Sequence, residues 1–161
     1  MKKTIIIAVA IFVLDAYLLN QGVIAMVFLF LVAPITLIKA SFAWKNADMR
    51  KRRLVAAGVY FIMAITVLAY IQVNNRRASR KADLLIAACK EYRAVHIAYP
   101  EKLTDLVPDF LEKIPKAKYA YSASQFHYVS REDAHLLWYV SFPPFGKRIY
   151  RFETKKWGFL D

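Results

Sequence analysis

A stretch of 45 residues without a proline, residues 54–98, constrains this chain more than any other feature. It begins with an uncharged apolar run and ends in an amphipathic segment, and four basic residues lie between the two: Arg76, Arg77, Arg80 and Lys81. Proline interrupts helices more strongly than any other residue, so one helix can run through the whole stretch. We therefore expect a long helix that leaves an apolar environment and continues into a water-exposed domain.

Three apolar runs explain a hydrophobic content of 58%, and they occupy residues 4–19, 23–38 and 54–73. A membrane-spanning helix needs about 20 apolar residues, which the third run supplies. The first two runs are shorter, and only three residues separate them. We expect them to form a helical hairpin whose flanks extend each span, which gives three spans in total. A re-entrant or interfacial hairpin is the alternative.

The net charge of +12 is distributed unevenly along the chain. Residues 1–81 contain 12 Lys and Arg against 2 acids, whereas residues 82–161 contain 12 against 10. The excess lies beside the apolar runs, and not on the domain that would have to contact phosphates, so we expect no nucleic-acid partner. The positive-inside rule then predicts a cytoplasmic N-terminus and a C-terminal domain on the opposite side of the membrane. We expect a multi-pass protein of the bacterial inner membrane with this domain in the periplasm.

The C-terminal part predicts a small α+β domain. Apolar residues at spacings of three and four mark one buried face of the helix over 82–98: Leu84, Leu85, Ala88, Cys89, Tyr92, Val95 and His96. Short turns over 100–115 would fold back on this helix, with Thr104 as an N-cap. Aromatic and β-branched residues then predict strands with short connections, and hence an antiparallel meander, at 119–121, 126–130, 135–142, 147–152 and 157–160.

The expected organisation has three parts. Residues 1–53 form a two-helix membrane hairpin with a basic cytoplasmic loop. Residues 54–81 form the third span and a basic juxtamembrane segment, and residues 82–161 form the periplasmic α+β domain.

A long helix, first apolar and then amphipathic, followed by a loop and a meander resembles the type IV pilin and pseudopilin plan. The loop sequence is similar to the segment after the helix in major pseudopilins of type II secretion systems, through Tyr92, Tyr99-Pro100, Leu103, Leu106-Val107-Pro108, Phe110-Leu111 and Ile114-Pro115. The resemblance implies a pilin-like globular domain that acts by protein contact.

The chain departs from the pilin pattern at the start of that helix. Gly58 follows the basic cluster, but Met63 stands where pilins have a glutamate, and two apolar runs precede it. The prepilin cleavage motif is therefore missing, and so is the acidic calcium loop of major pseudopilins. We expect neither leader cleavage nor polymerisation, and no functional residue of the family is carried over.

Polar and aromatic residues beside the apolar runs and in the strands are the candidate contact residues. Asp15 lies in an apolar run, so it either ends the span at the interface or faces a partner, which includes another of the chain's own helices. The basic juxtamembrane residues would contact anionic lipid headgroups or an acidic partner. Aromatic residues exceed what one sheet face can bury, so some would face a partner. The predicted contacts with lipid or protein are Asp15, Arg76, Arg77, Arg80, Lys81, Trp138, Phe145 and Trp157.

No pattern in the chain predicts a catalytic site. Cys89 and His96 are two helical turns apart, about 10 Å along the axis, which is too far for proton transfer. The histidines lack metal-ligand spacing. We therefore predict a non-enzymatic protein without metal, cofactor or small-molecule substrate. The enzymatic alternative is a hydrolase that would use His127, His135, Glu132 and Asp133.

These observations together predict an accessory, assembly or interaction subunit of an envelope complex related to pili or secretion. Its partners would be membrane lipids and other envelope or membrane proteins. The alternative is a small accessory subunit or assembly factor of a membrane enzyme, bound through the first two apolar runs.

Overall fold

The computed structural model describes residues 2–142 and 146–160. The chain forms two compact units, which are described separately. The N-terminal unit comprises Met1–Gln72 with Ala120–Ser122, and the C-terminal unit comprises Val73–Tyr119 with Ala123–Asp161.

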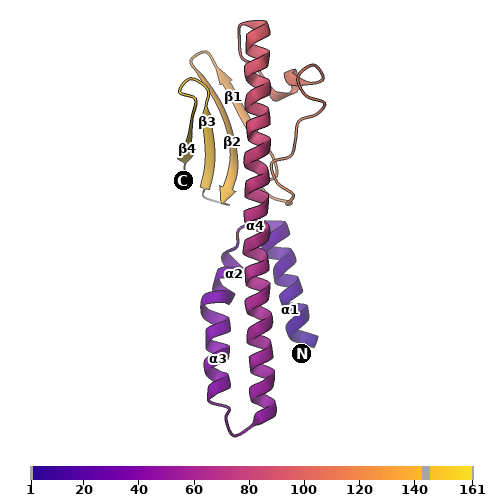
Figure 1. Cartoon of the computed structure of the whole chain (residues 1–161), viewed down its shortest axis with the longest axis vertical. Coiled ribbons are helices and arrows are strands. Elements are labelled where there is room, and N and C mark those ends of the chain that lie inside the picture. Colours follow the sequence, from indigo (N-terminus) through magenta and orange to yellow (C-terminus); the bar gives the residue numbers. More distant parts are fainter. Residues whose placement is uncertain (1, 143–145, 161) are drawn as a thin grey trace. The chain divides into compact units, whose positions relative to one another are not determined.

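One helix, α4 (Ala47–His96), is 50 residues long and contributes to both units (Figure 1). This confirms the long helix expected from the proline-free stretch. The Asn46 side chain caps its beginning by accepting a hydrogen bond from the Met49 amide at 3.0 Å. The helix ends two residues earlier than expected, because Ile97 adopts a left-handed conformation with φ 66°. The Ile97 amide still donates to the Arg93 carbonyl at 2.8 Å.

The N-terminal unit consists mainly of helices, and two of its helical elements, η1 and η2, are π-helices. In chain order the elements before α4 are α1 (Lys2–Phe12), η1 (Val13–Leu19), α2 (Val23–Val27), η2 (Phe28–Val32) and α3 (Ala33–Ser41). Small side chains dominate the contacts with α4, as in Ala8, Ala16, Ala25 and Ala64, which are all buried. Because small residues allow close approach of the helix backbones, this packing resembles that of helices in a membrane.

The expectation of three spans is wrong for the described residues. Two helices are long and apolar enough to cross a membrane, Val23–Ser41 and Ala47–His96. The helical segment that contains the first run, residues 2–19, does not qualify, because its 18 residues include three charged ones, Lys2, Lys3 and Asp15.

A tight turn between η1 and α2 depends on two left-handed residues. Asn20 has φ 53° and Gly22 has φ 75°. A Cβ on Gly22 would lie 3.1 Å from Ile71 Cδ1 and 3.2 Å from Leu68 Cδ2, so both the backbone angle and the packing require glycine here.

The C-terminal unit contains a four-stranded antiparallel sheet in the order β1-β2-β3-β4, which confirms the meander. The strands are β1 (His127–Arg131), β2 (Ala134–Phe142), β3 (Gly146–Arg151) and β4 (Lys156–Leu160). Figure 1 shows the sheet on one side of α4 and the segment with the short 3₁₀ helix η3 (Leu103–Leu106) on the other. Both pack on one core that includes Leu85, Cys89 and Leu106.

The buried face of α4 in this unit differs in part from the predicted face. Leu85, Ala88 and Cys89 are buried as expected, but Leu84 is 60% exposed and Val95 68% exposed. Ala78, Ala82 and Ile86 are buried in the same core, which shifts the contact face toward the start of the unit.

Two local predictions are also wrong in residues 97–126, called here the connecting segment, which join α4 to β1. Residues 119–121 are not a strand, because nearby amides bond elsewhere: that of Ala117 donates to the Ser124 carbonyl, and that of Tyr121 to the Tyr17 carbonyl. The N-cap of η3 is Lys102 and not Thr104. The Asp105 carboxylate accepts a hydrogen bond from the Lys102 amide at 2.8 Å, which closes that turn.

Candidate functional site

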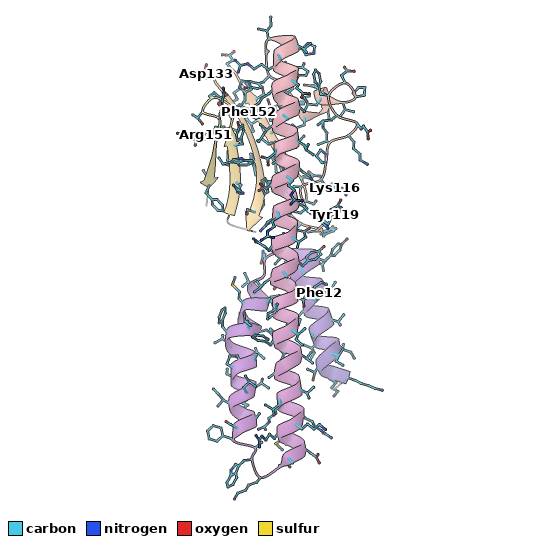
Figure 2. All side chains as sticks on the ribbon, in the orientation of Figure 1. Phe12, Lys116, Tyr119, Asp133, Arg151 and Phe152 are labelled. Atoms are coloured by element: carbon cyan, nitrogen blue, oxygen red, sulfur yellow. The ribbon has the colours of Figure 1, made fainter. Side chains whose placement is uncertain are left out.

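The strand register sorts the side chains of the sheet onto two faces. Residues opposite each other in an antiparallel ladder share a face, and neighbours along a strand point to opposite faces. Leu137, Tyr139 and Tyr150 point toward α4 and are at least 95% buried. Figure 2 labels two consecutive residues at the end of β3 that differ in exposure: Arg151 is exposed, whereas Phe152 is buried.

The opposite side of the sheet, called here the outer sheet face, is apolar at its centre. Five of its apolar residues are half-buried: Val129, Leu136, Trp138, Val140 and Ile149. A sixth, Leu160, is more exposed, at 49%. The His127 ring stacks on Trp138 with ring centroids 3.9 Å apart. Lys147 Nζ lies 5.1 Å from the centre of the same indole. Among the described residues, no helix or loop covers this face.

Charged side chains on the outer sheet face are all basic. The register places four of them there: Arg131, Lys147, Arg151 and Lys156. Arg151 pairs with both Leu136 and Lys156, so two cations lie beside the apolar centre. None of the outward-facing strand residues that the structure describes is acidic. The domain has nearly balanced charge, yet this face presents only one sign.

The three aromatic residues predicted as contacts have different positions. Trp138 lies on the outer sheet face. Trp157 lies on the inner face, where its ring packs 6.1 Å from Tyr139 and 5.4 Å from Tyr150. Phe145 lies outside the described residues. Sequence reasoning missed Arg151 and Lys156; the signal for them was the short β3–β4 connection, which fixes the register and puts them on the side of Trp138.

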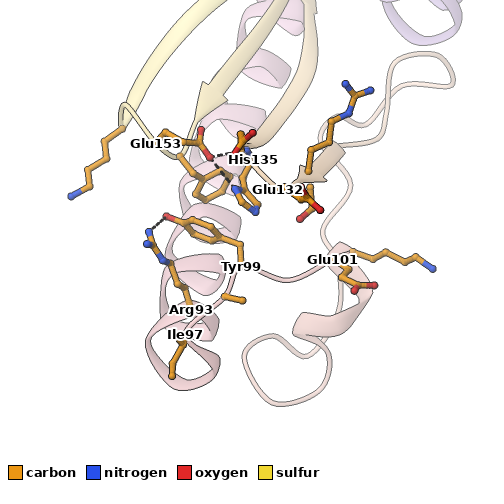
Figure 3. Close-up of a pocket in the computed structure, with 14 residues that line it drawn as sticks. Arg93, Ile97, Tyr99, Glu101, Glu132, His135 and Glu153 are labelled. Atoms are coloured by element: carbon orange, nitrogen blue, oxygen red, sulfur yellow. Dashed lines mark hydrogen bonds and ion pairs between the residues drawn. The ribbon is translucent and has the colours of Figure 1, made fainter.

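A second feature of the C-terminal unit is an open cavity of about 1100 Å³ near the end of α4, called here the distal cavity (Figure 3). His135 Nδ1 lies 2.9 Å from a Glu153 carboxylate oxygen. Arg93 donates to the Tyr99 hydroxyl at 3.1 Å, and the rings of Tyr99 and His135 lie 4.6 Å apart. Glu132 and Asp133 also line this cavity.

The hydrolase alternative required four side chains to converge. Three of them, Glu132, Asp133 and His135, line the distal cavity. His127 does not, because it lies at the opposite end of β1 and stacks on Trp138. In the described parts of the chain, no three His, Cys, Asp or Glu side chains gather in a way that could hold a metal ion.

Glu153 and His127 have shifted pKa values. Burial raises the pKa of Glu153, but hydrogen bonds from its own backbone amide, the His135 ring and the His135 amide outweigh this effect, so the pKa lies below its ordinary value. Burial and the charge of Lys147 lower the pKa of His127. His127 therefore favours its neutral form on the basic outer sheet face.

The four basic residues at positions 76, 77, 80 and 81 of α4 divide into two pairs. Lys81 Nζ donates to the Lys116 carbonyl at 2.8 Å and lies 4.4 Å from the centre of the Tyr119 ring. The Arg77 guanidinium lies 5.7 Å from the same ring. Arg77 and Lys81 therefore hold the connecting segment on α4, while Arg76 and Arg80 are exposed to contacts from outside.

Asp15 is fully buried in the N-terminal unit. One carboxylate oxygen accepts a hydrogen bond from the Gly22 amide at 2.9 Å, and the other from the Ala25 amide at 2.7 Å. These amides belong to the beginning of α2, whose first N–H groups have no partner within the helix. Both oxygens of Asp15 are thus satisfied within its own hairpin.

No family model, curated protein or solved structure matches this chain.

Proposed function

We propose that the protein is an inner-membrane protein of bacteria that presents its C-terminal unit in the periplasm and acts there by binding. Two helices that are long and apolar enough to span a membrane support the anchoring. The basic residues of the loop between α3 and α4 support the orientation, because cytoplasmic loops carry the excess of Lys and Arg.

One observation carries the proposal most strongly, the continuity of α4. The apolar part of this helix precedes Asn74, and its later part supplies Leu85 and Cys89 to the core of the C-terminal unit. A domain whose core includes an anchored helix cannot leave the membrane without unfolding. Such a domain suits a protein that holds a binding surface at a fixed place.

The class of complex that we propose is an envelope assembly related to pili or secretion, in which the protein is an accessory or assembly subunit. A long helix followed by a loop and a four-stranded meander supports a pilin-like domain. Met63 is buried in the core of the N-terminal unit, at the position where pilins have a glutamate. A glutamate at this position would not pack in the apolar core as Met63 does. The buried methionine therefore supports a helix that stays in the membrane as a permanent anchor.

Purification of the full-length protein tests this function. Tagged protein at native expression level is solubilised in mild detergent, and co-purifying proteins are quantified by mass spectrometry. We expect a membrane or periplasmic protein in fixed stoichiometry. A solitary monomer in size-exclusion chromatography would refute a role as a subunit.

A chain that lacks residues 1–53 separates the main proposal from its alternative. If the C-terminal unit binds, the partner still co-purifies with the shortened chain. If the partner is lost while α4 stays in the membrane, the first two apolar runs bind it, as in an accessory subunit of a membrane enzyme. Alkaline phosphatase fused to the C-terminus tests the orientation, since this reporter is active only outside the cytoplasm.

The distal cavity favours a second candidate function, a hydrolase. A glutamate that orients a histidine beside an open cavity is one element of general base catalysis. The test compares wild type with His135→Asn on ester, amide and phosphate model substrates. Equal rates for both proteins would exclude this role for His135.

A further inference from the structure

We propose that the outer sheet face is a docking surface for an acidic amphipathic helix of a partner protein. This inference rests on the proposed function, because it assumes that the C-terminal unit acts by binding. It adds where the partner binds and what chemistry the partner brings.

The dimensions of the outer sheet face suit one helix. Four strands about 4.8 Å apart give a surface about 14 Å wide. A helix with its side chains is about 10 Å across, so a single helix covers the apolar centre formed by Leu136, Trp138 and Ile149. These side chains are only partly exposed, so a packed helix would cover the apolar area that they leave open.

The basic side chains border this apolar centre. Arg151 lies two residues after Ile149 on β3, and Lys156 lies opposite it on β4. Lys147 lies two residues before Ile149, on the other side of the apolar centre. Acidic residues beside an apolar stripe on the partner helix would therefore reach cations on both sides. Complementary charges select the partner and fix its register.

The same charges exclude a face-to-face dimer of this chain. Two copies would oppose Arg131, Lys147, Arg151 and Lys156 with the same four cations, and like charges across an interface are repulsive. Lipid binding is less favoured than protein binding, because insertion into a bilayer needs apolar side chains that protrude. Trp138 instead packs between the His127 ring and Lys147.

The test uses full-length protein in phosphatidylcholine nanodiscs and two synthetic helical peptides. Both peptides carry the same leucine stripe; one flanks it with glutamates and the other with lysines. The receptor variants are wild type, the double substitution Arg151→Glu/Lys156→Glu, and the control Lys113→Glu. Lys113 is an exposed cation on the connecting segment, and its reversal matches the charge change of Arg151→Glu or Lys156→Glu alone, which are measured as single variants beside the double one. Circular dichroism verifies that each variant is folded.

We expect the acidic peptide to bind wild type and the Lys113→Glu control equally. Reversal of the two charges on the sheet turns exposed attractions into repulsions and weakens binding about tenfold. Added salt weakens the binding to wild type, and the lysine peptide does not bind. Equal binding of both peptides, or equal binding to wild type and the double variant, would overturn the proposal.

Vesicles rich in phosphatidylglycerol provide the competing outcome. The surface binds lipid, and the proposal is wrong, if two results occur together. The protein in nanodiscs binds these vesicles and loses this binding in Arg151→Glu/Lys156→Glu, and it does not bind the acidic peptide. The co-purification experiment keeps the proposed function separate. If the double variant retains its native partner in full, the docking surface is wrong while the role as a subunit stands.

Discussion

Lys118 is a buried cation whose titration should control the stability of the C-terminal unit. Its side chain is fully buried, and its ammonium donates a hydrogen bond to the Ser141 carbonyl at 2.8 Å. Burial lowers the pKa of Lys118 from 10.5 to about 8, because the charged form loses its hydration. The unfolded chain restores the higher value, so folding becomes linked to pH.

The sign and size of this effect follow from the two pKa values. Between pH 8 and pH 10.5 the unfolded chain binds a proton that the folded chain has released, so the stability contributed at this site rises with pH. A factor of ten in proton affinity corresponds to about 1.4 kcal/mol. The complete transition should therefore raise the free energy of unfolding by about 3 kcal/mol.

The assay compares this protein with Lys118→Met, which keeps most of the side-chain volume and cannot titrate. Urea unfolding in detergent is followed by the fluorescence of Trp157, with Trp44 and Trp138 replaced by Phe in both proteins. Other lysines and tyrosines titrate equally in the pair, so the difference in free energy between the two isolates Lys118. We expect this difference to increase by about 3 kcal/mol in favour of Lys118 from pH 7 to above pH 10.5. A difference that stays constant across this range would refute the argument.

Three further predictions concern single side chains. Asp15→Ala leaves two amides of a buried turn without an acceptor and should cost about 2–4 kcal/mol of stability, measured by thermal unfolding in detergent; an unchanged melting temperature would contradict the capping role. Ile97→Gly removes a left-handed β-branched residue that is 88% exposed and should stabilise the protein by about 1 kcal/mol in urea unfolding, whereas a loss would show that the Ile97 side chain packs. Because the pKa of Glu153 lies below its ordinary value, its carboxylate stabilises the fold above the ordinary glutamate pKa and loses this effect as the pH falls through the folded pKa. The stability of wild type over Glu153→Gln should thus diminish on acidification, and a pH-independent difference would contradict it.

Local signals were sufficient for most of the secondary structure. The proline-free stretch predicted the long helix α4, and alternating aromatic residues predicted the four strands that the sheet contains. The errors occurred where a tertiary contact competed with a local preference. Residues 119–121 have strand-like composition, but the amide of Tyr121 donates to the Tyr17 carbonyl and that of the nearby Ala117 to the Ser124 carbonyl.

Candidate contact residues were harder to predict than elements. The sequence left two interpretations of Asp15 open, the end of a span at the interface or a contact with a partner, and the structure supplies two amides from its own hairpin. It also selected Trp138 and Trp157 together, yet one faces outward and the other packs against Tyr150. Odd and even positions of a strand differ in environment only after one face of the sheet has been covered.

The sequence by itself determined the elements that depend on neighbours along the chain: the unbroken helix α4, the antiparallel meander, and the gathering of basic residues beside the apolar runs. Only the tertiary structure decided which surfaces are free. Arg151 and Lys156 become neighbours through strand pairing, and α4 covers the inner face of the sheet and leaves the outer one open. The physical reason is that helix formation and alternation are short-range, whereas burial and the grouping of charge depend on contacts between residues that are distant in sequence.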